Sequence, residues 1–256
     1  MQIKIFPPRG APNKPVLLAD KEDHAMKYPA LLLPVALLGA LGAPALAQDA
    51  GDWIVRAGAT QVAPQEDADA IALNGNVLTL GGQTASLSVD NSTQLGLTVQ
   101  YMLTPRLGVE LLAATPFDHT AAGTGPLAGL NIARAKQLPP TVSAVYYLSA
   151  DGPFRPYLGA GLNATVFFDE NVTGAAANTF ETLGLTGGSV DIDPSLGLAF
   201  QAGFDVDLND RWLLNGSVRW IDINTSATIK FDSGDVVSSD IEIDPWVYSL
   251  SLGYRF

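Results

Sequence analysis

The sequence contains no cysteine, which excludes a disulfide framework, a thiolate zinc site and a cysteine nucleophile. Basic residues are scarce: 14 Lys and Arg stand against 26 Asp and Glu, giving a net charge of -12. This balance argues against nucleic-acid binding, because no basic stripe is available to contact phosphates. Only 16% of the residues are charged and 47% are hydrophobic, a composition that argues against intrinsic disorder.

Long apolar runs are also absent, with one exception near the N-terminus. This run extends from Pro29 to Ala47 without a charge. A helical membrane protein would contain several such segments, so the single run argues against that class. The run is interrupted by proline, follows Lys27, and ends in Ala45-Leu46-Ala47. Small residues at the two outer positions of that tripeptide are typical of a signal peptidase site. The run therefore predicts a secretory signal rather than a membrane-spanning helix.

Three segments follow from this interpretation. We expect residues 26–47 to be a cleaved signal peptide that starts at Met26. Residues 1–25 then form a mis-annotated upstream extension, and an unusually long n-region is the alternative. Residues 48–256 form the mature chain, which we expect to be an exported outer-membrane β-barrel.

The mature chain alternates between apolar and small or polar residues with a period of two. Successive side chains of a β-strand point to opposite faces, so each alternating stretch predicts a strand. In the last stretch, one face carries Trp246, Tyr248, Leu250, Leu252, Tyr254 and Phe256. The eight stretches are 53–62, 95–103, 107–116, 141–148, 156–167, 195–206, 212–221 and 246–256.

One face of these strands is apolar and carries no charge, which favours a membrane barrel over a soluble sandwich. A soluble sheet would load its outer face with Lys and Glu, whereas Lys or Arg on a lipid face costs about 2–4 kcal/mol at the midplane. Connections alternate between short and long, as in outer-membrane barrels. The short ones are 104–106, 149–154 and 209–211; the long ones are 64–92, 117–138, 168–194 and 224–244. We therefore predict an all-β fold: an eight-stranded antiparallel transmembrane β-barrel with short periplasmic turns and long extracellular loops.

Several ordered motifs resemble the OmpW family of small outer-membrane barrels. They are NSTQLGL (91–97), GVELLAATPF (108–117) followed by His119, LPPT (138–141), RPY (155–157) with GAG (159–161) and FFD (167–169), and DPW (244–246) leading to GYRF (253–256). The resemblance spans the whole mature chain. It implies a narrow, largely apolar lumen that passes small hydrophobic molecules inward and releases them laterally into the membrane.

The inward positions of the predicted strands divide into a charged floor and an apolar upper part. The expected floor consists of Arg56, Glu110, Asp205 and Arg255, which would close the barrel as paired charges. The expected ligand path consists of Leu112, Ala114, Ile221 and Val247, with Arg219 as an inward charge beside it. The alternative is that these apolar residues only fill a solid barrel, because eight strands enclose space for little more than side chains.

Other residues have more modest expected roles. The aromatic ends Tyr254 and Phe256 predict recognition by the barrel assembly machinery. Prolines 116, 139, 140, 194 and 245 lie at outer strand ends, where they either interrupt the wall or simply terminate strands. His119 is the one histidine of the mature chain and has no serine nearby in sequence, so we expect a solvated loop residue, no catalytic residues and no enzyme.

The leading functional prediction is passive passage of small apolar solutes through the barrel. The alternative is a structural or adhesive barrel without a pore, which acts through its acidic extracellular loops. We expect no cofactor and no metal. Expected partners are outer-membrane lipid and lipopolysaccharide, the barrel assembly machinery and small apolar solutes, with no nucleic acid. The expected location is the outer membrane of a Gram-negative bacterium.

Overall fold

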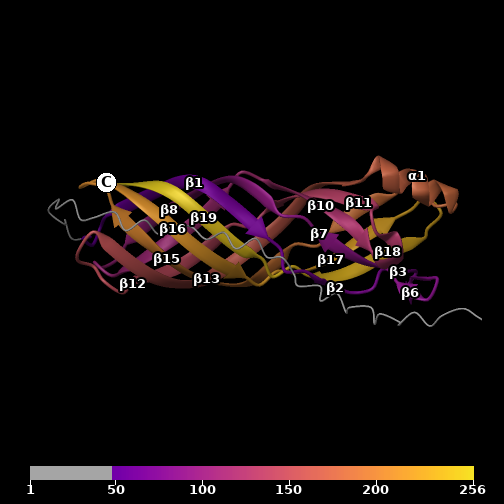
Figure 1. Cartoon of the computed structure of the whole chain (residues 1–256), viewed down its shortest axis with the longest axis horizontal. Helices are drawn as coiled ribbons and strands as arrows, with labels where there is room; N and C mark the ends of the chain where they lie inside the picture. Colours follow the sequence, from indigo (N-terminus) through magenta and orange to yellow (C-terminus); the bar gives the residue numbers. More distant parts are fainter. Residues whose placement is uncertain (1–47) are drawn as a thin grey trace, which may run out of the picture. The chain divides into compact units, whose positions relative to one another are not determined.

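The computed structural model describes residues 48–256 of the chain (Figure 1). The predicted upstream extension and signal peptide lie outside these residues. Apart from the α-helix α1 (Gly174–Thr182) and the short 3₁₀ helix η1 (Gly125–Leu127), regular structure in the described part is all β. No helix in this part is long and apolar enough to cross a membrane.

Eight long strands form a closed antiparallel barrel, and all eight predicted stretches are among them. They follow one another around the barrel in the order β12-β9-β8-β1-β19-β16-β15-β13, and the pairing of β12 with β13 closes the ring. The strands are β1 (Trp53–Ala63), β8 (Ser92–Met102), β9 (Leu107–Ala114), β12 (Thr141–Tyr147), β13 (Phe154–Val172), β15 (Ser195–Asp207), β16 (Trp212–Ile221) and β19 (Trp246–Arg255). The predicted fold class is confirmed.

Alternation along the strands separates an apolar outer face from a polar interior. In β19, Tyr248, Leu250 and Leu252 are exposed, while Val247 and Arg255 are buried. In β15, Leu196, Leu198 and Phe200 are likewise exposed. Exposed large apolar side chains around a closed barrel are what a lipid environment requires. The face assignment read from the sequence is therefore confirmed.

The four long connections are not irregular loops but continue largely as strands beyond the barrel. One sheet consists of the outer half of β13 with β11 (Asn131–Leu138), β10 (Phe117–Thr124) and β7 (Ser86–Val89). A second consists of β14 (Ser189–Ile192), β17 (Asn224–Lys230), β18 (Val236–Glu242), β3 (Ala72–Leu73) and β4 (Asn76–Val77), with β2 (Asp67–Ala68) also on β18. A separate hairpin joins β5 (Thr79–Leu80) and β6 (Gln83–Thr84).

We call these sheets the extension. Figure 1 shows β10, β11, β17 and β18 grouped at the end of the molecule away from the C-terminus. The short turns lie at the opposite, periplasmic end, so the extension projects on the extracellular side. The sequence pattern predicts no strands in these segments, because most of them are short and interrupted by polar or glycine residues. The reach of β13, which continues five residues past the predicted end at 167, was missed for the same reason.

The barrel wall is interrupted where the extension begins. The β9–β12 ladder ends with Leu112 opposite Thr141, and the β10–β11 ladder starts with Phe117 opposite Gln137. Between these pairs, within the described part of the chain, residues 113–116 form no strand pairing with residues 138–140. Pro116, Pro139 and Pro140 lie in this interval and have no N–H to donate. Strand β13 runs past the interval unbroken, pairing first with β12 and then with β11.

Candidate functional site

The interior of the barrel is crossed by a buried charge network centred on Arg56. Its guanidinium donates to both carboxylate oxygens of Asp205, with the shorter distance 2.7 Å between Nη2 and Oδ2. Arg56 Nη1 lies 3.3 Å from Glu110 Oε2. Arg56 Nη2 also donates to the hydroxyl of Tyr147 at 2.8 Å. Three of the four predicted floor residues, Arg56, Glu110 and Asp205, therefore lie together.

Arg219 belongs to the same network rather than to a separate upper path. Its Nη2 donates to Glu110 Oε1 at 2.8 Å, and the amide of Gln201 donates to the same oxygen at 3.1 Å. Two arginines thus face two carboxylates, all nearly inaccessible to solvent. Buried charges are stable only when they are paired and hydrogen-bonded, and this arrangement meets that condition.

Arg255 forms a second cluster that is separate from Arg56. Its Nη2 donates to Asp207 Oδ1 at 3.0 Å. Arg155, which our list of floor residues omitted, forms two hydrogen bonds with the Asp207 carboxylate. Beside this cluster, Tyr254 and Phe256 stand on the outer face with ring centroids 4.7 Å apart. Their proposed role in assembly stays a prediction.

Very little space remains around the charge network. A void of about 10 Å³ lies among Leu112, Arg56 and Arg219 and the hydroxyls of the neighbouring strands. Such a volume holds about one water molecule. A solute has no open route along the barrel axis at this level.

An apolar layer lies above the charge network, toward the extension. Ile221 and Val247 pack here with Ile223, Ile241 and Ile243, and Ala114 contacts the layer from its edge. We call this layer, completed by Val62, Phe117 and Ala199, the isoleucine plug. The prediction that the upper interior is apolar agrees with this packing, but the side chains fill the space rather than line an open funnel.

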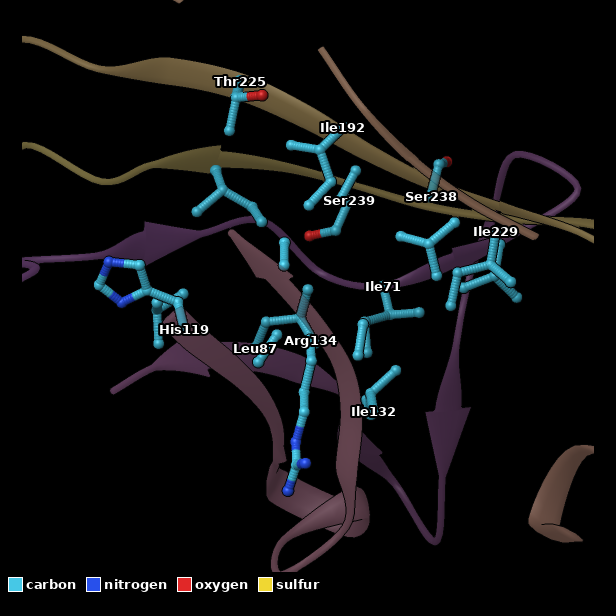
Figure 2. A pocket seen from close by; sticks show the side chains of 18 of the residues that line it. Ile71, Leu87, His119, Ile132, Arg134, Ile192, Thr225, Ile229, Ser238 and Ser239 are labelled. Carbon is cyan, nitrogen blue, oxygen red and sulfur yellow. The ribbon is translucent and has the colours of Figure 1, made fainter. Parts of the chain in front are cut away.

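A larger apolar cavity lies within the extension, and we call it the outer cavity. Its volume is about 110 Å³, and both extension sheets contribute to its lining. Figure 2 shows Leu87 and Ile132 of one sheet opposite Ile192 and Ile229 of the other sheet. Ile241 and Ile243 line the outer cavity and also belong to the isoleucine plug, so the plug forms its base.

None of the five residues predicted for the ligand path is among the residues that line the outer cavity in the described part of the chain. Leu112 and Arg219 lie at the small void, and Ala114, Ile221 and Val247 lie at the isoleucine plug. Their role in solute passage stays a prediction. The sequence does carry a signal for the lining residues: Val190-Asp191-Ile192-Asp193 and Asp240-Ile241-Glu242-Ile243 alternate strictly between apolar and acidic residues.

His119 corrects one expectation of the sequence analysis. We expected a solvated loop residue, but it lies in β10, its side chain is only 9% exposed, and it lines the outer cavity. Its Nδ1 is 2.8 Å from the carbonyl oxygen of Asp90.

Two residues near the barrel, Gln137 and Phe167, line the cavity beside the wall interruption. In Figure 2 the guanidinium of Arg134 is directed away from the isoleucines of the opposite sheet.

The surface of the extension carries its own electrostatic contacts. Hydrogen bonds from Ser233 and Asn74 hold the pKa of Asp235 below its ordinary value, because both stabilise the ionised carboxylate. Lys136 contacts Asp169 at 2.7 Å, and this hydrogen bond raises the pKa of the lysine.

Among residues 48–256, no group of three or more His, Asp or Glu side chains is arranged to hold a metal ion.

A closed eight-stranded antiparallel barrel with an apolar outer face, a charge-paired interior and an extracellular extension defines a small outer-membrane β-barrel protein. The model of the OmpW family matches residues 49–256, and the chain belongs to the OmpW family. It is 44% identical to outer membrane protein W of Vibrio cholerae over 226 residues, covering 87% of this chain and 97% of that protein. The protein is therefore an outer-membrane protein.

Two further comparisons bear on structure and function. The crystal structure of the outer membrane protein OprG from Pseudomonas aeruginosa is 40% identical, with a TM-score of 0.72, and the match covers 82% of this chain and 98% of OprG. The dibenzothiophene metabolism operon protein PahQ of Pseudomonas aeruginosa is 27% identical, covering 84% of this chain and 93% of PahQ.

Proposed function

We propose that the protein passes small hydrophobic molecules across the outer leaflet, receiving them in the outer cavity and releasing them sideways through the wall interruption. The outer cavity is the observation that carries this proposal. It is almost wholly apolar, it lies on the extracellular side, and it stands directly above the membrane-embedded barrel. Each methylene group moved from water into such a cavity gains about 0.8 kcal/mol.

The closed interior supports lateral release rather than passage along the axis. Below the outer cavity, a solute would have to displace the isoleucine plug and then the charge network of Arg56 and Asp205. Bringing an apolar molecule among those charges would separate buried ion pairs, which costs several kcal/mol. The axial route is therefore closed to apolar solutes as well as to ions.

The wall interruption lies beside the base of the outer cavity. Gln137 and Phe167 line the cavity and are paired with each other across β11 and β13. Gln137 also pairs with Phe117, the residue that follows Pro116. Immediately below these residues, the ladder between 113–116 and 138–140 is missing. A solute at the base of the cavity thus has the lipid on the other side of a weakly paired segment.

The named relative PahQ supports the same class of solute. Its name connects it with an operon for the metabolism of dibenzothiophene, an aromatic sulfur compound. The apolar lining of the outer cavity suits the same class of solute.

Uptake of a fluorescent apolar solute by intact cells tests the proposal. Ala227 lines the outer cavity from β17, so Ala227→Arg places a charge in it, and we expect uptake to fall to the level of cells without the protein. Thr228 is the next residue on the same strand and does not line the cavity, so Thr228→Arg is the matched control and should leave uptake unchanged. Equal uptake in all strains, with folded protein in each outer membrane, would contradict the proposal and direct attention to adhesion by the acidic extension.

A further inference from the structure

Two residues that line the otherwise apolar outer cavity each carry a buried polar side-chain atom without a hydrogen-bond partner among residues 48–256. The two atoms are Nε2 of His119 and Nε2 of Gln137. His119 has a side chain 9% exposed, and Gln137 is 2% exposed. Buried polar groups in folded proteins are nearly always satisfied, so two unsatisfied groups in one apolar cavity indicate a ligand that completes them.

The hydrogen-bonding role of His119 follows from its other nitrogen. Nδ1 lies 2.8 Å from the carbonyl oxygen of Asp90, which can only accept, so Nδ1 carries the proton. In the neutral ring, Nε2 is then an acceptor. Two contacts fix this orientation: the Asp90 carboxylate accepts from the backbone N–H of Thr120 at 2.7 Å, and the ring stacks on Phe117 with centroids 6.4 Å apart.

Gln137 supplies the complementary group. Its unpaired atom is the amide nitrogen, which donates. In the β10–β11 ladder, Phe117 pairs with Gln137 and His119 pairs with Ala135, so His119 and Gln137 are diagonal neighbours on one face. One acceptor and one donor are thus held side by side at the cavity wall.

Two other polar groups of the cavity lining already have hydrogen-bond partners. The hydroxyl of Ser239 already donates to the carbonyl of Asp69 at 2.9 Å, and that of Thr225 donates to the carbonyl of Asp193 at 2.5 Å. Among the lining residues, His119 and Gln137 are the two that carry buried side-chain atoms without a partner in the described part of the chain.

We propose that the solute of this protein carries a hydroxyl group on an apolar body, as in an alcohol or a phenol. The hydroxyl donates to Nε2 of His119 and accepts from the amide of Gln137, and the hydrocarbon fills the apolar remainder of the cavity. A pure hydrocarbon leaves both protein groups unsatisfied, and a carboxylate turns a lone pair toward the lone pair of His119. This inference rests on the proposed function and narrows its substrate class.

The test compares three fluorescent probes of matched size: 1-naphthol, naphthalene and 1-naphthoate. Binding is measured with the full chain as it exists in the membrane, in lipid nanodiscs, and corrected for partition into nanodiscs without protein. We expect 1-naphthol to bind roughly tenfold more tightly than naphthalene, the effect of about two hydrogen bonds. Naphthoate should bind more weakly than 1-naphthol.

Two variants assign the preference to the two residues. His119→Phe keeps an aromatic ring without the acceptor, and Gln137→Leu keeps the volume without the donor. In each, we expect the preference for 1-naphthol to fall severalfold while naphthalene binding is retained. Thr228→Ala is the control, because Thr228 lies on β17 and does not line the outer cavity, and it should preserve the preference.

The outcomes separate this inference from the proposed function. Equal binding of 1-naphthol and naphthalene, or a preference retained in both variants, overturns the hydroxyl assignment while the apolar cavity stands. Tightest binding of naphthoate also overturns it. If neither neutral probe binds and Ala227→Arg has no effect on uptake, the proposed function falls and the hydroxyl assignment falls with it.

Discussion

Arg56 is buried, with 1% of its surface exposed, so its charge has to be balanced inside the barrel. Asp205 supplies two of its hydrogen bonds, and Glu110 and Tyr147 supply others. Asp205 in turn accepts from Tyr147 and from Asn215, both at 2.8 Å. Each arginine of the network is paired with a carboxylate. Removal of one charged member therefore leaves a buried opposite charge unpaired.

Arg56→Met is therefore expected to destabilise the folded barrel by about 3–5 kcal/mol, the usual cost of breaking a buried ion pair from one side. The double variant Arg56→Met with Asp205→Asn removes both charges and should recover much of that loss. Urea unfolding in lipid vesicles measures both. A double variant less stable than the single one would show that the pairing of these charges is not what stabilises the interior.

Individual residues also show which features of the site could be predicted from the sequence. The clustering of Arg56, Glu110 and Asp205 could be predicted because strand alternation alone places them inside the barrel, where charges must pair. The separation of Arg255 could not, because it depends on the register that brings Arg255 to Asp207. His119 was misplaced because its burial is produced by β7 and β11, strands that the sequence analysis had not identified.

At the scale of elements, the two prolines between β11 and β12 have different orientations. The carbonyl of Pro140 accepts from the N–H of Ala164 on β13 at 3.0 Å, so the backbone of residue 140 faces β13. Because backbone groups alternate along a strand, residue 139 faces the opposite side, toward the interruption. An N–H at position 139 would therefore point at residues 113–116, whereas one at position 140 would not.

Pro139→Ala is expected to strengthen the weak segment of the wall and reduce apolar uptake severalfold, because it adds a donor that faces the interruption. Pro140→Ala is the matched control and should leave uptake near the wild-type level. Hydrogen exchange of residues 113–116 gives a second readout, with more protection expected only in Pro139→Ala. Equal effects of the two substitutions would argue against release at this position.

The barrel strands could be predicted from the sequence, whereas the extension could not. Lipid demands an uninterrupted apolar face over a whole strand, and that demand produces a pattern that is readable in β15 or β19. The extension strands meet water on one side and a small apolar cavity on the other. Elements of two residues such as β3 and β4 carry too little pattern to be recognised, and in β18 only the end, from Asp240 onward, alternates between acidic and apolar residues.

The whole molecule combines a closed axis with a weakened side wall. The isoleucine plug and the charge network block the axis at two successive levels, and the outer cavity lies beyond both. Under the proposed function, apolar solutes and ions would not share a route, so we expect the protein to pass apolar solutes without conducting ions.

Planar-bilayer recordings together with uptake measurements test this separation. We expect wild-type protein to add no ion conductance above the lipid background, because the void at the charge network holds about one water. The double variant Arg56→Ser with Asp205→Ser replaces two larger side chains in the barrel interior by small ones and removes one charge of each sign. The interior then has more space for water, so conductance should rise. Apolar uptake in cells should stay unchanged, because its route leaves the barrel above that level. Loss of uptake in parallel with a gain of conductance would instead mean that solutes pass along the axis and that lateral release is wrong.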